Sequence, residues 1–143
     1  MKNLFVLIST VSVFFLTGCH KYVDPDILFY QEGYEITSNN ISVDLDSSIE
    51  MQIECMAPTV LGHVDYKLFL PNNDNYIDLN QRPDILHVYY QNQSESLQGN
   101  RIGEVQRAVF KMDFSEPTFH IGDTCVLNVS IPELEKSLRF IVK

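Results

Sequence analysis

Regular alternation of apolar and polar residues is the feature that most limits what this chain can form. In residues 49–55, apolar side chains occupy every second position, and Glu or Gln occupies the positions between them. Because successive side chains of a strand point to opposite faces, this period of two predicts strands with one buried face. The same period recurs over residues 41–45, 64–70, 107–114, 125–131 and 138–142.

Turn-forming residues separate these segments and indicate the fold class. A short piece at 76–79 and the aromatic-rich stretch 85–91 follow a loop with three asparagines. About seven to nine short strands, spaced by about 8–12 residues, are typical of an antiparallel β-sandwich or barrel. We expect tight hairpin turns at residues 46–48 and 132–136. No segment after residue 19 keeps the 3.6-residue apolar period of a helix, so the expected class is all-β.

The first 18 residues have the features of a cleaved export signal. Lys2 gives a positive start, and the apolar run from Leu4 to Leu16 is shorter than the roughly 20 residues needed to span a bilayer. A charged start, a short apolar core and small residues before a cleavage point are typical of secretory signals. The run ends in Leu16-Thr17-Gly18-Cys19, which resembles the lipobox of bacterial lipoprotein precursors.

This resemblance implies that residues 1–18 are removed and that Cys19 becomes a lipidated first residue. In that class the cysteine sulfur carries a diacylglyceryl group and the new amino terminus is usually acylated, and two or more acyl chains hold a protein stably on a membrane. His20 stands where an inner-membrane retention signal would place Asp, so by analogy the expected location is the bacterial outer membrane. The alternatives are an ordinary secretory signal cut elsewhere or a buried N-terminal helix.

Residues 19–143 have the size of one domain. We expect a lipidated tether over 19–26 and a β-sandwich domain over 27–143. Loss of Lys2 with the signal would change the formal net charge from −9 to −10. An acidic surface of this kind, with no basic patch, repels phosphate backbones and argues against nucleic-acid binding.

Cys55 and Cys125 are expected to form a disulfide, because exported proteins fold in an oxidising compartment. Cys55 ends one alternating apolar face and Cys125 begins another, so both should point into the same core. Closing a loop of about 70 residues would stabilise the fold by roughly 4 kcal/mol. The alternative is two free, buried thiols or one reactive cysteine. Lipidation of Cys19 would leave an even number of cysteines to pair.

These positions are similar to those of the immunoglobulin fold, in which a strand-B cysteine bridges to strand F. Residues 41–55 resemble strand A′, a turn and strand B of that family, and residues 122–125 fall where the E–F corner and strand F would lie. The resemblance implies an immunoglobulin-like sandwich, and a transthyretin-like sandwich would explain the same residues. The chain contains no Trp, so we expect Phe and Tyr to fill the core.

Residues that could carry catalysis or hold a metal follow no known motif. His63 with Asp65, and His120 with Asp123, could each supply two metal ligands, but no His-x-x-x-His or Cys-x-x-Cys spacing accompanies them. Residues 72–78 are rich in Asn and Asp but lack the glycine and final glutamate of an EF-hand loop. There is also no nucleophile elbow and no phosphate-binding glycine loop. We expect a protein that is not an enzyme, with no catalytic residue, metal or cofactor.

The polar segment from Asn92 to Gly103 is expected to be a partner-binding loop, with a mobile solvated linker as the alternative. It is longer than a tight hairpin requires, and loops at one end of a sandwich commonly recognise partners. Of the adjacent Tyr89 and Tyr90, one should point into the core and the other outward. The candidate partner-binding residues are Tyr89, Tyr90, Asn92 and Arg101.

The expected function is therefore that of a lipid-anchored envelope protein, tethered through Cys19, that binds an envelope or extracellular protein. Accessory, inhibitor or immunity, and adhesion roles all fit this description. One alternative is a carbohydrate-binding surface lipoprotein, in which an outward tyrosine stacks on sugar rings. A second alternative is an unrecognised hydrolase, because carboxylate pairs that act together converge only in space.

Overall fold

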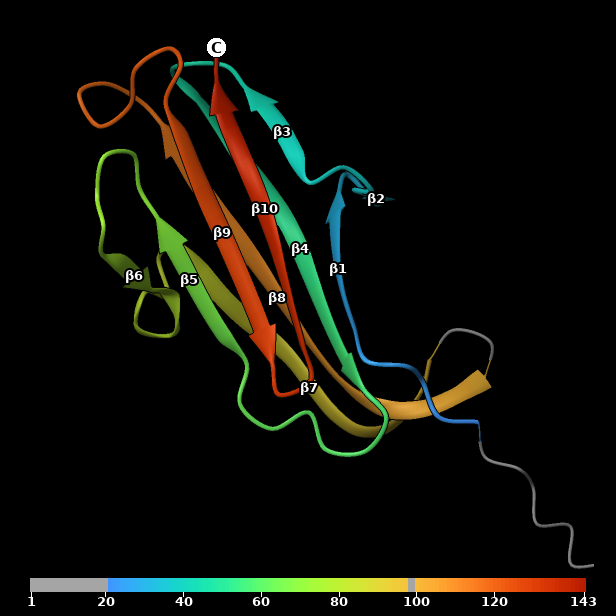
Figure 1. Cartoon of the computed structure of the whole chain (residues 1–143). Coiled ribbons are helices and arrows are strands. Elements are labelled where there is room, and N and C mark those ends of the chain that lie inside the picture. The colour runs from blue at the N-terminus through green and yellow to red at the C-terminus, as the bar shows by residue number, and fades with distance from the viewer. Residues whose placement is uncertain (1–20, 98–99) are drawn as a thin grey trace, which may run out of the picture.

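The computed structural model of the chain is built from strands (Figure 1). It describes residues 21–97 and 100–143, so Cys19 and the expected signal peptide lie outside the described residues. Within the described ranges, no helix is long and apolar enough to cross a membrane. The elements are β1 (Asp26–Gln31), β2 (Tyr34–Glu35), β3 (Asn40–Val43), β4 (Ser47–Ala57), β5 (Asp65–Phe69), β6 (Tyr76–Asp78), the 3-10 helix η1 (Leu79–Gln81), β7 (Leu86–Leu97), β8 (Arg101–Phe114), β9 (Thr124–Ile131) and β10 (Leu134–Val142).

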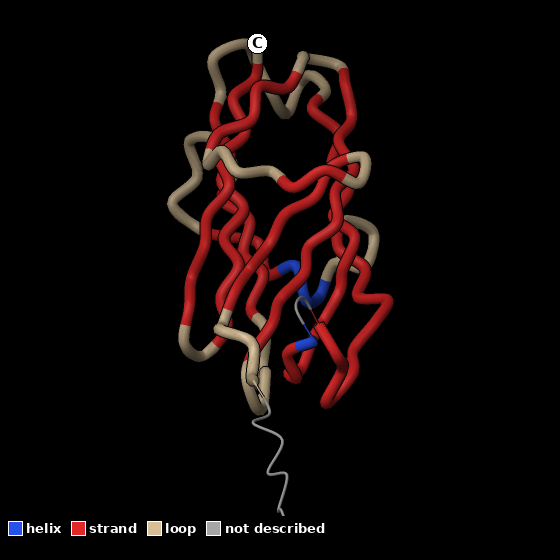
Figure 2. The backbone as a smooth tube through the Cα atoms, turned by 90° about the vertical axis from the view of Figure 1, so that its right-hand side faces the viewer, coloured by secondary structure: helices blue, strands red, loops and turns tan. Residues whose placement is uncertain are grey.

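The strands form two sheets that pack face to face as a sandwich (Figure 2), which confirms the predicted fold class. The first sheet has the order β2-β1-β4-β8-β7 and the second β3-β10-β9-β5-β6. The orders β1-β4-β8-β7 and β10-β9-β5 correspond to A-B-E-D and G-F-C of the immunoglobulin sandwich. Named strands pair antiparallel, except that β3 runs parallel to β10. The segments that resemble strands A′, B and F are β3, β4 and β9.

Strand β1 was not predicted, because its apolar residues do not alternate. Ile27, Leu28 and Phe29 are all buried. Ile27 and Phe29 belong to the core between the sheets, whereas Leu28 belongs to a second, smaller apolar cluster on the outer face of the first sheet. That outer cluster buries Val23, Leu28, Met56 and Val105. Burial on both faces turns the period of two into a continuous apolar run.

One of the two predicted hairpin turns is confirmed and the other is wrong. Residues 132–133 connect β9 to β10, and the hairpin pairs Ile131 with Leu134. Residues 44–46 instead lead from β3 in the second sheet to β4 in the first, because β3 pairs with β10. Asp46 makes this crossing with a positive φ of 62°, and its amide donates to the carbonyl of Phe114 at 2.7 Å.

The predicted loop 92–103 is also wrong, because most of this segment is a strand pair. β7 and β8 remain paired as far as Leu97 and Arg101, whereas β4 pairs with β8 only as far as Ala57 and Glu104. The hairpin therefore extends beyond the sandwich (Figure 1). Much of this extension is solvent-exposed on both faces, so its sequence lacks the apolar alternation that marks a half-buried strand.

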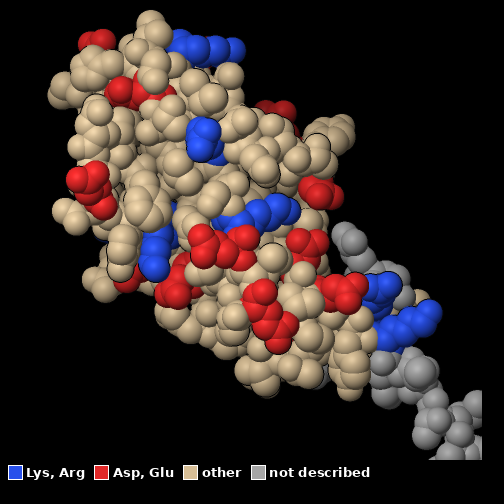
Figure 3. Space-filling view, in the orientation of Figure 1, with Lys and Arg blue, Asp and Glu red and all other residues tan. Residues whose placement is uncertain are grey.

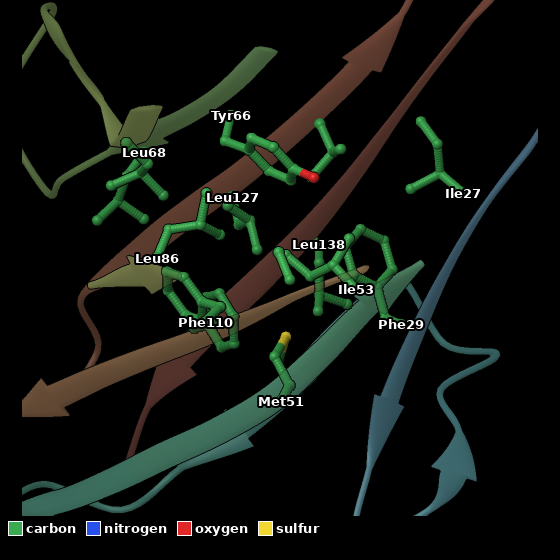
Figure 4. Packing of buried hydrophobic residues seen from close by; sticks show 14 of the residues in the cluster. Ile27, Phe29, Met51, Ile53, Tyr66, Leu68, Leu86, Phe110, Leu127 and Leu138 are labelled. Atoms are coloured by element: carbon green, nitrogen blue, oxygen red, sulfur yellow. The ribbon is translucent and has the colours of Figure 1, made fainter. Parts of the chain in front are cut away.

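Aromatic side chains fill much of the core between the sheets, as the absence of Trp predicted (Figure 4). Phe110 of β8 stacks on Phe140 of β10 with ring centroids 5.7 Å apart. Phe114 lies 5.6 Å from Phe140 and 5.1 Å from Phe119, measured between centroids. Tyr66 enters the same core from β5. Each such ring contributes about 1.5–3 kcal/mol through burial alone.

The predicted disulfide between Cys55 and Cys125 is wrong, although both residues are buried in the core as expected. In the second sheet, Cys125 pairs with Phe140 of β10. The Phe140 ring stacks across the core on Phe110 of β8, and in the first sheet Phe110 pairs with Met51 of β4. Cys125 thus lies at the level of Met51. Because Met51 precedes Cys55 by four residues of β4, the two cysteines are about 13 Å apart along the strands. A disulfide requires Cα atoms within about 7 Å.

Strand direction explains this separation. β4 and β9 run the same way through the sandwich (Figure 1). Cys55 lies near the end of β4 and Cys125 near the beginning of β9, so the two thiols lie toward opposite ends of the core.

Candidate functional site

A groove opens between the two sheets at the end of the sandwich remote from residues 21–23. β7 begins only at Leu86, opposite Phe110, so the last part of β8 has no β7 residue beside it. In the other sheet, the edge strand β6 is only three residues long. The space between these two edges has a volume of about 550 Å³. That volume is within the range of ligand-binding sites in proteins, about 300–1,000 Å³.

The floor of the groove is apolar and continuous with the core. Ile49, Leu68 and Phe119 are buried core residues. Ile77 of β6 and Met112 of β8 also line the groove and are only half-buried. An incoming apolar side chain would therefore cover surface that the sandwich itself leaves partly exposed.

Charged side chains form the rim of the groove. Lys111 Nζ lies 2.8 Å from a carboxylate oxygen of Glu50. Arg82 contacts both carboxylate oxygens of Asp84, through Nε at 2.9 Å and Nη2 at 2.6 Å. The hydrogen bond from Arg82 holds the pKa of Asp84 below its usual range. Asp113 adds a further carboxylate, so the rim contains three acidic and two basic groups.

The groove also exposes main-chain groups of β8. The amide of Lys111 donates to the carbonyl of Ile85 at 2.7 Å, so odd-numbered residues here direct their backbone groups toward the β7 side. The carbonyl of Phe114 accepts from Asp46 on the other side, as this alternation requires. Asp113 is the next residue on the β7 side, and β7 has no residue opposite it. Its amide and carbonyl can therefore pair with an added strand.

Comparison of the sequence with protein-family profiles and with curated proteins found no match.

The predicted residues Tyr90 and Asn92 lie together on the outer face of the first sheet, in a network centred on Arg107. Asn92 donates to the Tyr90 hydroxyl at 3.0 Å, and that hydroxyl donates to Glu95. Arg107 lies over the Tyr90 ring, 4.8 Å from its centroid, and contacts Glu54 at 2.6 Å and Glu95 at 3.2 Å. The Tyr90 hydrogen bond, aided by Arg107, lowers the pKa of Glu95. These polar groups are thus already engaged with one another.

The prediction that one of the two adjacent tyrosines points into the core is wrong. A β-bulge lies between Val88 and Tyr90, and Tyr89 is the additional residue. A bulge breaks the period of two, so both tyrosines lie on the outer face. Tyr89 is 47% exposed and lies beside Tyr30 and Arg107 at a shallow depression of about 250 Å³.

Arg101 lies apart from the other predicted residues. It stands at the start of β8 on the protruding hairpin, and its guanidinium contacts Asp24 at 3.1 Å. Tyr89, Tyr90 and Asn92 therefore lie on one face of the first sheet, whereas Arg101 lies at the end of the sandwich near residues 21–24.

Both described thiols are poor nucleophiles. Burial raises the pKa of Cys55 and that of Cys125 to about 12, so both are protonated at neutral pH. Cys55 Sγ lies 3.9 Å from the Tyr66 hydroxyl, which accepts a hydrogen bond from Gln106 at 2.9 Å. This buried polar group is a satisfied part of the core.

The suggested metal ligands occur only in pairs. His63 Nε2 lies 3.1 Å from Asp65 Oδ1, and His120 Nδ1 lies 3.6 Å from Asp123 Oδ2. Over residues 21–97 and 100–143, no three His, Cys, Asp or Glu side chains are grouped as a metal site. The Asn and Asp side chains of residues 72–78 accept hydrogen bonds from nearby backbone amides and stabilise the local turns.

Proposed function

We propose that this chain is a lipid-anchored protein of the bacterial outer membrane that binds an envelope or extracellular protein and catalyses no reaction. Cys19, in its lipobox-like context, supplies the anchor. The observation that carries the binding role is the groove, where an apolar floor, a charged rim and an unpaired strand end converge.

An extended segment of the partner fits this combination better than a compact ligand does. Its backbone would pair with Asp113, and its alternate side chains would cover Ile77 and Met112. Strand addition of this kind takes affinity from main-chain hydrogen bonds and specificity from side-chain contacts. The excess of carboxylates on the rim favours a segment that carries basic residues.

Cross-linking in intact cells tests this assignment. A photo-reactive amino acid in place of Ile77, in the full lipidated protein, should form an adduct with one envelope or extracellular protein. Met112→Glu should abolish most of that adduct, because it places a charge among the apolar residues that line the groove. Ser137→Glu, on an exposed position of β10, is the matched control and should leave the adduct unchanged. No protein adduct at position 77, or an adduct insensitive to Met112→Glu, would contradict the proposal.

The anchor is tested separately. Mass spectrometry of membrane fractions should find Cys19 as the first residue, with the added mass of acyl chains. Cys19→Ser should release the protein from the membrane. A variant that stays membrane-bound would show that the tether is something else.

Glycan binding is a second candidate, which the depression beside Tyr89 favours. An exposed tyrosine ring next to Tyr30 and Arg107 offers a stacking surface and a hydrogen-bond donor for a sugar. Under this hypothesis, envelope polysaccharide in a native gel retards the protein, and Tyr89→Ala removes the retardation. Tyr34→Ala, at a 78% exposed residue outside the depression, is the control. Equal mobility with and without polysaccharide would exclude this candidate for the glycans used.

A further inference from the structure

Residues 21–23 lie along the protruding part of β8 and are joined to it by an isolated β-bridge. The amide of Ile102 donates to the carbonyl of Lys21 at 2.8 Å, and the amide of Val23 donates to the carbonyl of Ile102 at 3.1 Å. Tyr22 pairs with Ile102 in the parallel sense. Val23 is buried in the outer apolar cluster with Met56. The chain is thus attached to the domain from Lys21 onward, within the segment predicted as a tether.

Very little chain separates this attachment from the proposed lipid. His20 is the single residue between Cys19 and Lys21. Consecutive Cα atoms are 3.8 Å apart, so the Cα of Cys19 lies within about 8 Å of that of Lys21 in any backbone conformation. A diacylglyceryl group on the Cys19 sulfur would hold that residue in the headgroup layer. The end of the β7–β8 hairpin is then held at the same layer while residues 21–23 stay paired.

The exposed side chains at this end suit a lipid surface. Tyr22 is 53% exposed, and tyrosine is enriched at membrane–water interfaces because its ring is apolar and its tip polar. Basic side chains gather at the lower right of the described surface in Figure 3. Lys21 belongs to this end and suits anionic headgroups, whereas Arg101 is paired there with Asp24. Val60, 70% exposed in the loop between β4 and β5, adds an apolar contact at the lower end (Figure 1).

We infer that this end of the sandwich rests on lipid headgroups and that the groove faces away from the membrane. The inference rests on the proposed lipidation of Cys19. β4 has 11 residues and runs along the sandwich from the groove toward the hairpin end. Ile49 of the groove precedes Ala57 by eight positions, which places the groove about 26 Å from the level of the docked segment. A partner in the surrounding space can reach a groove at that height.

In this orientation, the loops that immunoglobulin variable domains use for recognition have a different role. The B–C and F–G connections, here residues 58–64 and 132–133, lie at the lower end of the sandwich, toward the docked segment (Figure 1). In variable domains these loops contact antigen. Here they face lipid, so protein recognition falls to the groove at the other end.

Fluorescence quenching by lipid tests the orientation. The full lipidated protein, with Ser96→Cys or Ile121→Cys labelled by a fluorophore, is placed in phosphatidylethanolamine–phosphatidylglycerol vesicles containing a headgroup-labelled quencher lipid. Ser96 lies exposed on the hairpin, and Ile121 is 74% exposed at the opposite end. The native thiols are buried and protonated and stay unlabelled. We expect the probe at position 96 to be quenched several-fold more than the probe at position 121.

The outcomes separate the orientation from the anchor. Equal quenching of the two probes on vesicle-bound protein overturns the orientation and leaves the lipidation of Cys19 intact. Protein that does not bind the vesicles overturns the anchor, and with it the orientation.

A longer tether is the matched variant. Inserting about 15 Gly and Ser residues between His20 and Lys21 leaves the fold and the lipid unchanged but lets the domain leave the surface. Quenching at position 96 should fall several-fold. Undiminished quenching would show that the short tether does not set the orientation.

Discussion

The backbone of Gly103 lies against the side chain of Val23, with no room for a Cβ atom between them. A Cβ built at position 103 would overlap Val23 Cγ2 and lie 2.5 Å from the carbonyl oxygen of Ala57. Glycine thus lets β8 approach both the end of β4 and the N-terminal segment. This close packing makes residues 21–23 part of the domain.

Gly103→Ala should therefore destabilise the protein and loosen residues 21–23. Overpacking of a tight contact costs about 1–3 kcal/mol, which urea unfolding would measure. Ser96→Ala, at an exposed position of the same hairpin, should change stability by less than about 0.5 kcal/mol. A Gly103→Ala protein as stable as the parent would contradict the packing described here.

The two buried thiols should make the protein sensitive to alkali. Burial raises the pKa of Cys55 and that of Cys125 from 9.0 to about 12, so their stabilising effect is complete below pH 9 and is lost as pH rises toward 12. Each thiol should lower the free energy of unfolding by about 1.4 kcal/mol per pH unit above 9. Cys55→Ala with Cys125→Ala should lose less stability than the parent between pH 8 and 10.5 in urea unfolding. Identical losses would show that the thiols do not titrate as free, buried groups.

Glu104 should hold the loop between β4 and β5 in place. This carboxylate is 6% exposed and accepts a hydrogen bond from the amide of Leu61 at 2.5 Å. Glu104→Ala leaves that buried amide without its acceptor, so we expect a loss of about 1–3 kcal/mol and faster proteolysis within 58–64. Glu104→Gln keeps an acceptor and should lose less. Glu133→Ala, at an exposed turn, is the control, and equal effects of all three changes would exclude this role.

Glu95 should contribute to stability at neutral pH and not in acid. The Tyr90 hydrogen bond and Arg107 hold the pKa of Glu95 below its usual value of 4.5. The contribution is present above that value and is lost as pH falls through the lower pKa of the folded protein. Glu95→Gln should therefore show a smaller fall in the urea midpoint between pH 5 and pH 3 than the parent protein. A parallel fall in both proteins would contradict the role of this network.

Alternation predicted the strands that bury one face, and it could not predict the others. β4, β5 and β9 each place one row of side chains in the core, so their sequences alternate. β1 is buried on both faces, and much of the outer part of the β7–β8 pair is exposed on both, so neither segment alternates. The same limit applies to Cys55 and Cys125, because alternation gives the face of a residue but not its height along the sandwich.

The groove could not be predicted from the motifs, because it depends on where β7 begins. Pro83 is the one local signal, since proline cannot donate to a strand ladder and tends to precede a strand. Its effect on the facing end of β8 becomes visible only when the strand order is known. Ile77 and Met112 lie far apart in the sequence, and the two sheets bring them to the same opening.

Amide hydrogen exchange, read residue by residue on the vesicle-bound lipidated protein, measures most directly whether residues 21–23 are docked on β8. The amides of Val23 and Ile102 should exchange orders of magnitude more slowly than in an unstructured peptide, because each donates to a backbone carbonyl across the pair. Exchange of both at the unstructured rate, with the Phe110 amide still protected in the core, would show that the segment is free and would contradict the docking.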